Sequence, residues 1–253
     1  EPRGSRYRLA HVFHAEGIAH SLAHAKYVKA ISYAKVKTDA VDAATLAQLL
    51  RGNLIPEAHM VSPELREVRD LLRQRLVLVA KRTRCRNAVR GLLMQYNVEA
   101  PTALPELPAL EATLHTEQGE LLTRQIKRVG QQLHPRLVPN ADVQRLLRIP
   151  GIGKIAAFTL HLEIDGIARF RAVRPFFSYC RLVPGAQNSG GKERDKGTED
   201  GNRYLKLAFS HAAVRAIQYN PEIRRWYLAR ARRKGPLIGR ALVAKELARI
   251  VYA

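Results

Sequence analysis

Apolar residues recur every three or four positions along much of the chain, and this pattern predicts a largely helical protein. The longest such run extends from Leu65 toward Tyr96. It begins at Ser62, Pro63 and Glu64, where a cap, a proline and an acidic residue form a typical helix start. At 1.5 Å per residue, we expect a helix of roughly 50 Å.

A second apolar series over residues 110–133 predicts another long helix, which His134 and Pro135 should end. The proline-punctuated stretch 101–108 separates the two. The near-heptad spacing suits an antiparallel hairpin or a coiled-coil dimer contact. Simple packing within the subunit explains the spacing equally well.

The first 50 residues predict a piece of an α/β layer. We expect a short helix over residues 6–15 that Gly17 ends, a strand over 18–23, and helices over 26–34 and 37–50. This helix–strand–helix alternation is typical of α/β architecture.

The C-terminal part predicts a helical domain that opens with a helix-hairpin-helix. Helices are expected over 142–149 and 155–164, joined by a tight turn that contains Gly151, Gly153 and Lys154. Two glycines allow backbone N–H groups and a helix N-terminus to approach a phosphate, and the lysine adds charge. A plain helical turn is the alternative. Further helices are expected over 170–179, 204–217 and 238–252.

The charge balance indicates a polyanionic partner. The 253 residues carry a formal net charge of +21, with a pI near 10.6. Residues 144–253 contain 22 basic and 8 acidic residues, a net of +14 against +7 for the remainder. Such an excess most often accompanies nucleic-acid binding. The arginines along the helix from residue 63 either contact phosphates or form a solvated face.

The sequence predicts a cytoplasmic protein with no membrane partner. No apolar run approaches the roughly 18 residues that a membrane span requires, and no secretory signal is visible. Cys85 and Cys180 lie far apart and form no metal motif, which favours a reduced compartment.

The most distinctive stretch is the polar, glycine-rich segment 182–206, for which a loop is expected. Ser189 is followed there by two glycines, which permit close approach to another molecule. A hydroxyl held beside a phosphodiester among cations could act as a nucleophile. Ordinary turn chemistry with a solvated basic loop is the alternative. The expected nucleic-acid contacts around the serine are Gly190, Gly191, Lys192, Arg194, Lys196 and Arg203.

Asp39 and Asp42 form a second candidate site at the start of a predicted helix. They are three residues apart and therefore share a helix face. Paired carboxylates can hold Mg²⁺, which prefers oxygen ligands. Helix capping and stabilisation of the helix dipole explain the same residues without a metal.

Segment 182–206 resembles the C-terminal transposase motif of insertion-sequence family 110 and its 1111 subgroup. The shared elements are a proline, a Ser-Gly pair, two later glycines and a leucine that opens a helix: Pro184, Ser189, Gly190, Gly197, Gly201 and Leu205. Upstream segments 150–154 and 170–174 match the flanking pattern. Residues 1–50 resemble the N-terminal DEDD domain of the same family, which is RuvC-like (RNase H-like).

The resemblance implies roles for individual residues. Ser189 falls on the motif serine, which attacks a DNA phosphodiester to form a covalent intermediate. Glu1, Asp39 and Asp42 fall on the second, third and fourth acids of the DEDD quartet, which holds Mg²⁺. The first Asp belongs on an upstream strand that this sequence lacks, so we expect a fragment of a longer protein with an incomplete RuvC-like domain.

The resemblance also implies DNA strand exchange in a homo-oligomer, a dimer or tetramer, guided by a structured RNA. It places the protein at the nucleoid of a bacterial cytoplasm. We expect a partial DEDD domain with the long helix over 1–98, a linker and coiled-coil helix over 99–141, and the transposase domain over 142–253. Two alternatives stay open: a non-catalytic nucleic-acid-binding remnant, and a metal-dependent nuclease in which Ser189 is only a turn residue.

Overall fold

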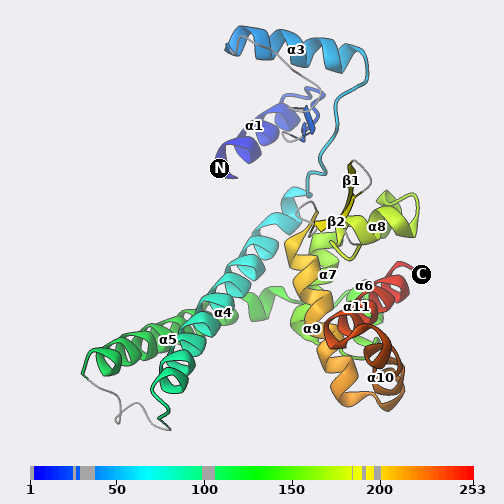
Figure 1. The fold of residues 1–253 in the computed structure, drawn as a ribbon. Coiled ribbons are helices and arrows are strands. Elements are labelled where there is room, and N and C mark those ends of the chain that lie inside the picture. Colours follow the sequence, from blue (N-terminus) through cyan, green and yellow to red (C-terminus); the bar gives the residue numbers. More distant parts are fainter. Residues whose placement is uncertain are drawn as a thin grey trace. The chain divides into compact units, whose positions relative to one another are not determined.

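The computed structural model describes residues 3–24, 27–28, 38–98, 106–183, 185–189, 192–196 and 201–253. The chain divides into two compact units, Glu1–Ser62 and Pro63–Ala253. The structure is mostly helical, as expected, and the two strands that it describes pair with each other (Figure 1). None of the described helices has the length and apolarity needed to cross a membrane.

The first unit contains helix α1 (Arg3–Ala15) and helix α3 (Asp39–Arg51). Both helices were expected, and Gly17 ends α1 with a positive φ of 65°. The strand expected over 18–23 is wrong. Only Ala23 pairs there, in an isolated bridge with Glu57, because the described part of this unit offers no neighbouring strand to extend the pairing. The RuvC-like sheet is therefore not confirmed and remains an expectation.

The second unit begins with two long helices, α4 (Pro63–Gln95) and α5 (Glu106–Leu133), as the apolar spacing predicted. They pack side by side and antiparallel, because the end of α5 lies beside the start of α4. Nη1 of Arg136, just after α5, donates to Oε1 of Glu67 at 2.5 Å, and Sγ of Cys85 lies 3.8 Å from Oε1 of Gln118. The pairing confirms packing within the subunit. Figure 1 shows their far ends running away from the C-terminal helices.

The C-terminal helices surround α9 (Arg203–Tyr219), which contacts α7 (Lys154–Ile164), α10 (Pro221–Lys234) and α11 (Pro236–Tyr252). The remaining elements are η2 (His134–Arg136), α6 (Ala141–Leu147), η3 (Ile167–Arg169) and α8 (Val173–Tyr179). Alanines at positions 208, 212, 213 and 216 of α9 are nearly inaccessible and allow close helix approach. The core between these helices is aromatic and aliphatic: Phe176, Phe209, Leu160, Leu205, Leu247 and Val143.

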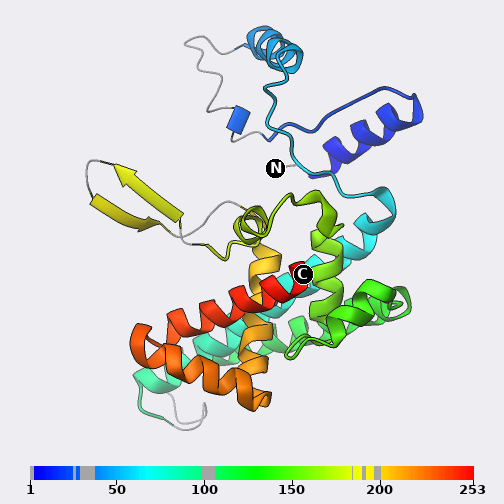
Figure 2. The same ribbon diagram turned by 90° about the vertical axis from the view of Figure 1, so that its right-hand side faces the viewer.

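The segment expected as a loop around Ser189 is instead a β-hairpin. Strand β1 (Gly185–Ser189) pairs antiparallel with β2 (Lys192–Lys196), and Figure 2 shows the two strands outside the helical bundle. The prediction of a loop was wrong because polar and glycine residues argued against a strand. A Gly-Gly pair between two segments in register is, however, also typical of a hairpin connection.

Candidate nucleic-acid interface

The register of the hairpin groups its residues by charge. Ser189 lies opposite Lys192, and Gln187 lies opposite Arg194. Directly opposed residues share a face of an antiparallel pair, and alternate residues of one strand share a face. The backbone therefore assigns Ser189 to the same face as residues 192, 194 and 196, which are all basic. The acidic residues 193 and 195 fall on the other face. Gly190 and Gly191 lie outside the described residues.

Both ends of the hairpin segment are held at the end of helix α8. Arg181 adopts a positive φ of 56° directly after α8, and its Nε donates to the carbonyl of Gly201 at 2.9 Å. The backbone N–H of Asn202 donates to the carbonyl of Tyr179 at 2.6 Å. Gly201 is required here, because a Cβ would lie 2.6 Å from that same carbonyl oxygen. The chain thus leaves and returns at one fixed place.

A buried ionic network holds the returning end. The Glu163 carboxylate, 2% exposed, accepts from Arg73 Nε at 2.5 Å and from Arg73 Nη2 at 2.6 Å. Its Oε2 also accepts from Asn202 Nδ2 at 2.6 Å. Burial by itself lowers the pKa of the Arg73 guanidinium, but the hydrogen bond and charge of Glu163 outweigh this and raise it. Arg73 therefore stays charged, as the paired carboxylate requires.

Asn202 joins this network to helix α9. Its Oδ1 accepts from the backbone N–H groups of Tyr204 and Leu205, so it is the N-cap of α9. Arg73 lies over the Tyr204 ring at 4.7 Å, and Arg203 covers the same ring at 4.9 Å. Arg203, predicted to contact phosphate, is exposed at the first position of α9, two residues after the anchored Gly201.

Glu163 and Asn202 are functional candidates that the sequence reasoning missed. Glu163 is the one carboxylate in the mostly apolar segment 155–164, and such an isolated acid could have been recognised as a buried, paired group. Asn202 stands directly before an apolar periodic run, where an N-cap is expected. Cys180, also at this place, is fully buried, and burial raises the pKa of its thiol, so it is not a reactive group.

The predicted phosphate-binding turn lies in a groove between α4, α7 and α9. Helices α6 and α7 flank the turn as expected, although a helix-hairpin-helix is not confirmed. Gly151 packs directly against α9 and leaves no space for a side chain. A Cβ at this position would lie 2.2 Å from the carbonyl oxygen of Ala212. Gly153 and Lys154 are exposed. The groove encloses about 420 Å³, and its basic lining residues are Arg75, Lys154, His211 and Arg215.

The two predicted metal ligands occupy the first turn of α3 in the first unit. Asp39 and Asp42 are both exposed, and Thr38 caps the helix by accepting from the N–H of Val41 at 3.3 Å. The capping role therefore belongs to Thr38, whereas both aspartates lie in the first turn, where their charge stabilises the helix dipole. Glu1 lies outside the described residues, and no group of three metal-binding side chains occurs within the described ones. Two free-standing carboxylates suit Mg²⁺ chemically but form only part of a site.

Two family models match the chain. A model described as "Transposase", for the DEDD domain of IS110 elements, matches residues 2–98. A model described as "Transposase IS116/IS110/IS902 family" matches residues 143–228. Together they match 183 of the 253 residues.

Curated relatives agree with these models. A "Probable family 20 transposase" of Pseudomonas aeruginosa is 28% identical over 86% of this chain and 71% of the relative. The "Transposase for insertion sequence element IS1111A" of Coxiella burnetii is 28% identical over 95% and 72%, respectively. A "Putative transposase y4pF/y4sB" of Sinorhizobium fredii is 25% identical over 85% of this chain, which spans only 62% of that relative.

The matches cover both the part that carries Asp39 and Asp42 and the part that carries Ser189. With a strongly basic surface and the serine hairpin anchored between helices α8 and α9, they lead to one conclusion: the chain belongs to the IS110/IS116/IS902 family of transposases.

Proposed function

We propose that this chain carries out DNA strand exchange through covalent catalysis by Ser189. The observation that carries the proposal is the hairpin register, which assigns the serine to the basic face of the β1–β2 ribbon. A phosphodiester on that face would meet the hydroxyl beside three cations and away from the carboxylates. The anchored ends at Gly201 and Asn202 support it further, because a nucleophile must be held at a defined position.

In the proposed step, the Ser189 Oγ attacks the phosphorus and a P–O bond to one sugar oxygen breaks. The hydroxyl proton leaves to a base, and the departing sugar oxygen is protonated. A phosphoserine–DNA ester results, and attack by another strand's hydroxyl reverses the step and joins new ends. Lys192, Arg194, Lys196 and Arg203 would stabilise the charge on the phosphate oxygens.

The direct test is to trap and map the ester. The protein is incubated with DNA that contains the ends of an insertion element, and the mixture is then denatured and digested with protease and nuclease. We expect mass spectrometry to find one peptide with a nucleotide attached to Ser189. A nucleotide on any other residue, or cleaved DNA with no protein attached, would contradict the proposal.

Asp39 and Asp42, with Glu1, are the proposed ligands of Mg²⁺, which would supply Lewis-acid activation of the phosphate or hydroxyl when bound. Their exposure and the separate cap at Thr38 leave both carboxylates available. Replacing both by asparagine is expected to lower strand cleavage by at least about 100-fold, a typical cost of losing transition-state charge stabilisation. DNA affinity in EDTA should be unchanged, because the DNA contacts lie on other residues. Equal cleavage by wild type and variant would remove these aspartates from the reaction.

A structured guide RNA and a homo-oligomeric state remain predictions from the family resemblance. The basic charge of +21 is compatible with an RNA partner in addition to DNA. The nuclease alternative differs in one outcome: its cleavage would survive loss of the Ser189 hydroxyl and depend on the aspartates alone.

A further inference from the structure

One face of helix α4 carries a line of cations outside the serine hairpin. Arg82, Arg86 and Arg90 lie 7, 11 and 15 residues after Arg75. These intervals are close to two, three and four turns of 3.6 residues, so the four arginines share one face. At 1.5 Å per residue the line is about 22 Å long. Beyond Asp70, α4 contains no acidic residue.

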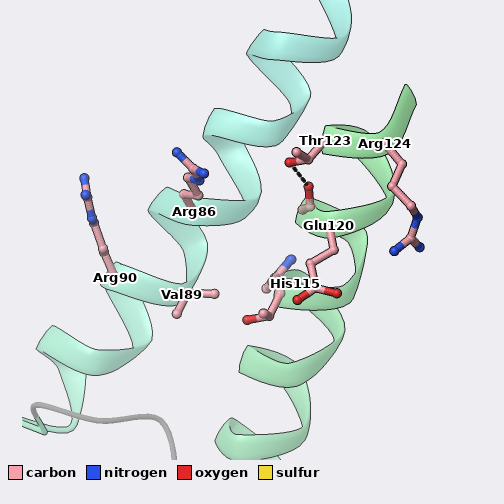
Figure 3. A pocket seen from close by; sticks show the side chains of 9 residues that line it. Arg86, Val89, Arg90, His115, Glu120, Thr123 and Arg124 are labelled. Atoms are coloured by element: carbon pink, nitrogen blue, oxygen red, sulfur yellow. Dashed lines mark hydrogen bonds between the residues drawn. The ribbon is translucent and has the colours of Figure 1, made fainter. Parts of the chain in front are cut away.

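This face opens into a cavity at each end. At the α7 end, Arg75 lines the groove described above together with Lys154 and Arg215, and none of the lining residues is acidic. At the far end, Arg86 and Arg90 line a second groove of about 620 Å³ between α4 and α5 (Figure 3). Arg124 on α5 adds a cation there, and Glu120 is the one carboxylate in that lining.

The cations of this face are available to a ligand. Arg86, Arg90, Lys154 and Arg215 are exposed, and Arg75 and Arg82 are half-buried. Figure 3 shows Arg86 and Arg90 extending from α4 with neither joined to Glu120. Nη1 of Arg215 donates a hydrogen bond to the Tyr219 hydroxyl at 3.0 Å, which orients the guanidinium.

We propose that this α4 face, defined by Arg75, Arg82, Arg86 and Arg90 with Lys154 and Arg215, is a track for the phosphate backbone of duplex DNA. The residues that line the grooves include no Phe, Tyr or Trp and one histidine each, His115 and His211, so neither groove provides the series of aromatic rings on which single strands stack. At 3.4 Å of axial rise per base pair, a line of about 22 Å spans roughly six base pairs of a duplex. The inference rests on the proposed action on DNA, since that identifies the duplex as DNA.

The track would hold DNA that flanks the site of strand exchange and fix its direction relative to the second unit. Phosphate contacts carry no sequence information, so we expect the track to contribute affinity and position without sequence preference. This differs from the role proposed for the serine hairpin, whose cations act on the reacting phosphate.

The test compares two double variants of one helix. Arg86→Gln with Arg90→Gln removes two charges from the track, whereas Lys81→Gln with Arg84→Gln removes two exposed charges from other faces of α4. Affinity for a 30-base-pair duplex of arbitrary sequence is measured across a salt series. The track variant should lower the slope of log affinity against log salt by about two, at roughly 0.9 per lost phosphate contact. The control variant should leave the slope unchanged.

Equilibrium binding does not require the serine reaction, so this result and failure of the Ser189 mechanism are distinguishable. Equal loss of slope in both variants, or no loss in either, would overturn the track. The proposal would also be overturned if a single strand or an RNA duplex bound more tightly than the DNA duplex and lost as much affinity when Arg86 and Arg90 were replaced. As a measurement independent of stability, a photoreactive residue at position 86 should crosslink to duplex DNA and one at position 84 should not; the reverse would contradict the proposal.

Discussion

Ser189→Ala is expected to abolish formation of the covalent DNA adduct and strand exchange, with a rate loss of at least about 10⁴-fold. The hydroxyl oxygen would be the atom that bonds to phosphorus, and alanine offers no substitute. DNA affinity should change by less than about threefold, because a single neutral hydroxyl contributes little beside the charged contacts. Gel-shift and strand-exchange assays on the same preparation measure both quantities.

The hairpin position makes the variant a clean test. Ser189 ends strand β1, and alanine is compatible with its backbone. Ser178→Ala is the matched control, since Ser178 is an exposed serine on α8, next to the hairpin's anchor, and should leave strand exchange intact. Undiminished cleavage by Ser189→Ala would favour the metal-dependent nuclease. Absence of any adduct in wild type with intact DNA binding would favour the non-catalytic module.

Glu163→Leu is expected to lower the free energy of unfolding by about 3 kcal/mol, the lower end for breaking a buried ion pair, because Arg73 is left without its partner. The Arg73 side chain is 21% exposed, which lets water relieve part of this cost. Asn202 also loses its acceptor, so the returning end of the hairpin should loosen. Urea unfolding monitored by circular dichroism measures the loss.

Three further variants separate charge pairing from simple disruption. Glu163→Gln keeps an acceptor for Asn202 and should cost less than Glu163→Leu. Combining Glu163→Leu with Arg73→Met should recover part of the stability, because two apolar side chains replace a buried pair without leaving a charge unmatched. Glu246→Gln breaks an exposed pair with Arg249 and should leave stability nearly unchanged, because solvent screens such pairs. Equal losses for Glu163→Gln and Glu246→Gln would show that the buried network contributes nothing special.

The same network links stability to the proposed chemistry. Loss of the Asn202 contact should reduce strand exchange more than DNA binding, because the hairpin carries the reacting serine but only part of the proposed DNA contacts. A variant that folds and binds DNA but exchanges strands at the wild-type rate would show that anchoring at Asn202 is purely structural.

Local pattern was sufficient for the helices and for the candidate chemistry. Helices α3, α4 and α9 each combine a start signal with apolar residues at helical spacing, and both properties depend only on neighbouring residues. The basic excess likewise indicated a nucleic-acid-binding protein, and the resemblance of segment 182–206 indicated a transposase. Local pattern failed at residues 18–23, because a strand requires a partner that its own sequence does not specify.

The tertiary structure alone decided which groups meet. The contact between Arg73 and Glu163 joins residues 90 positions apart, and no periodicity predicts such a pairing. The register that places Ser189 opposite Lys192 depends on how two strands align, since a shift by one residue would move the serine to the acidic face. The chemistry of the residues could therefore be inferred from the sequence, whereas the strand face of Ser189, the contacts of Asn202 and the two grooves beside the arginine line depend on the three-dimensional fold.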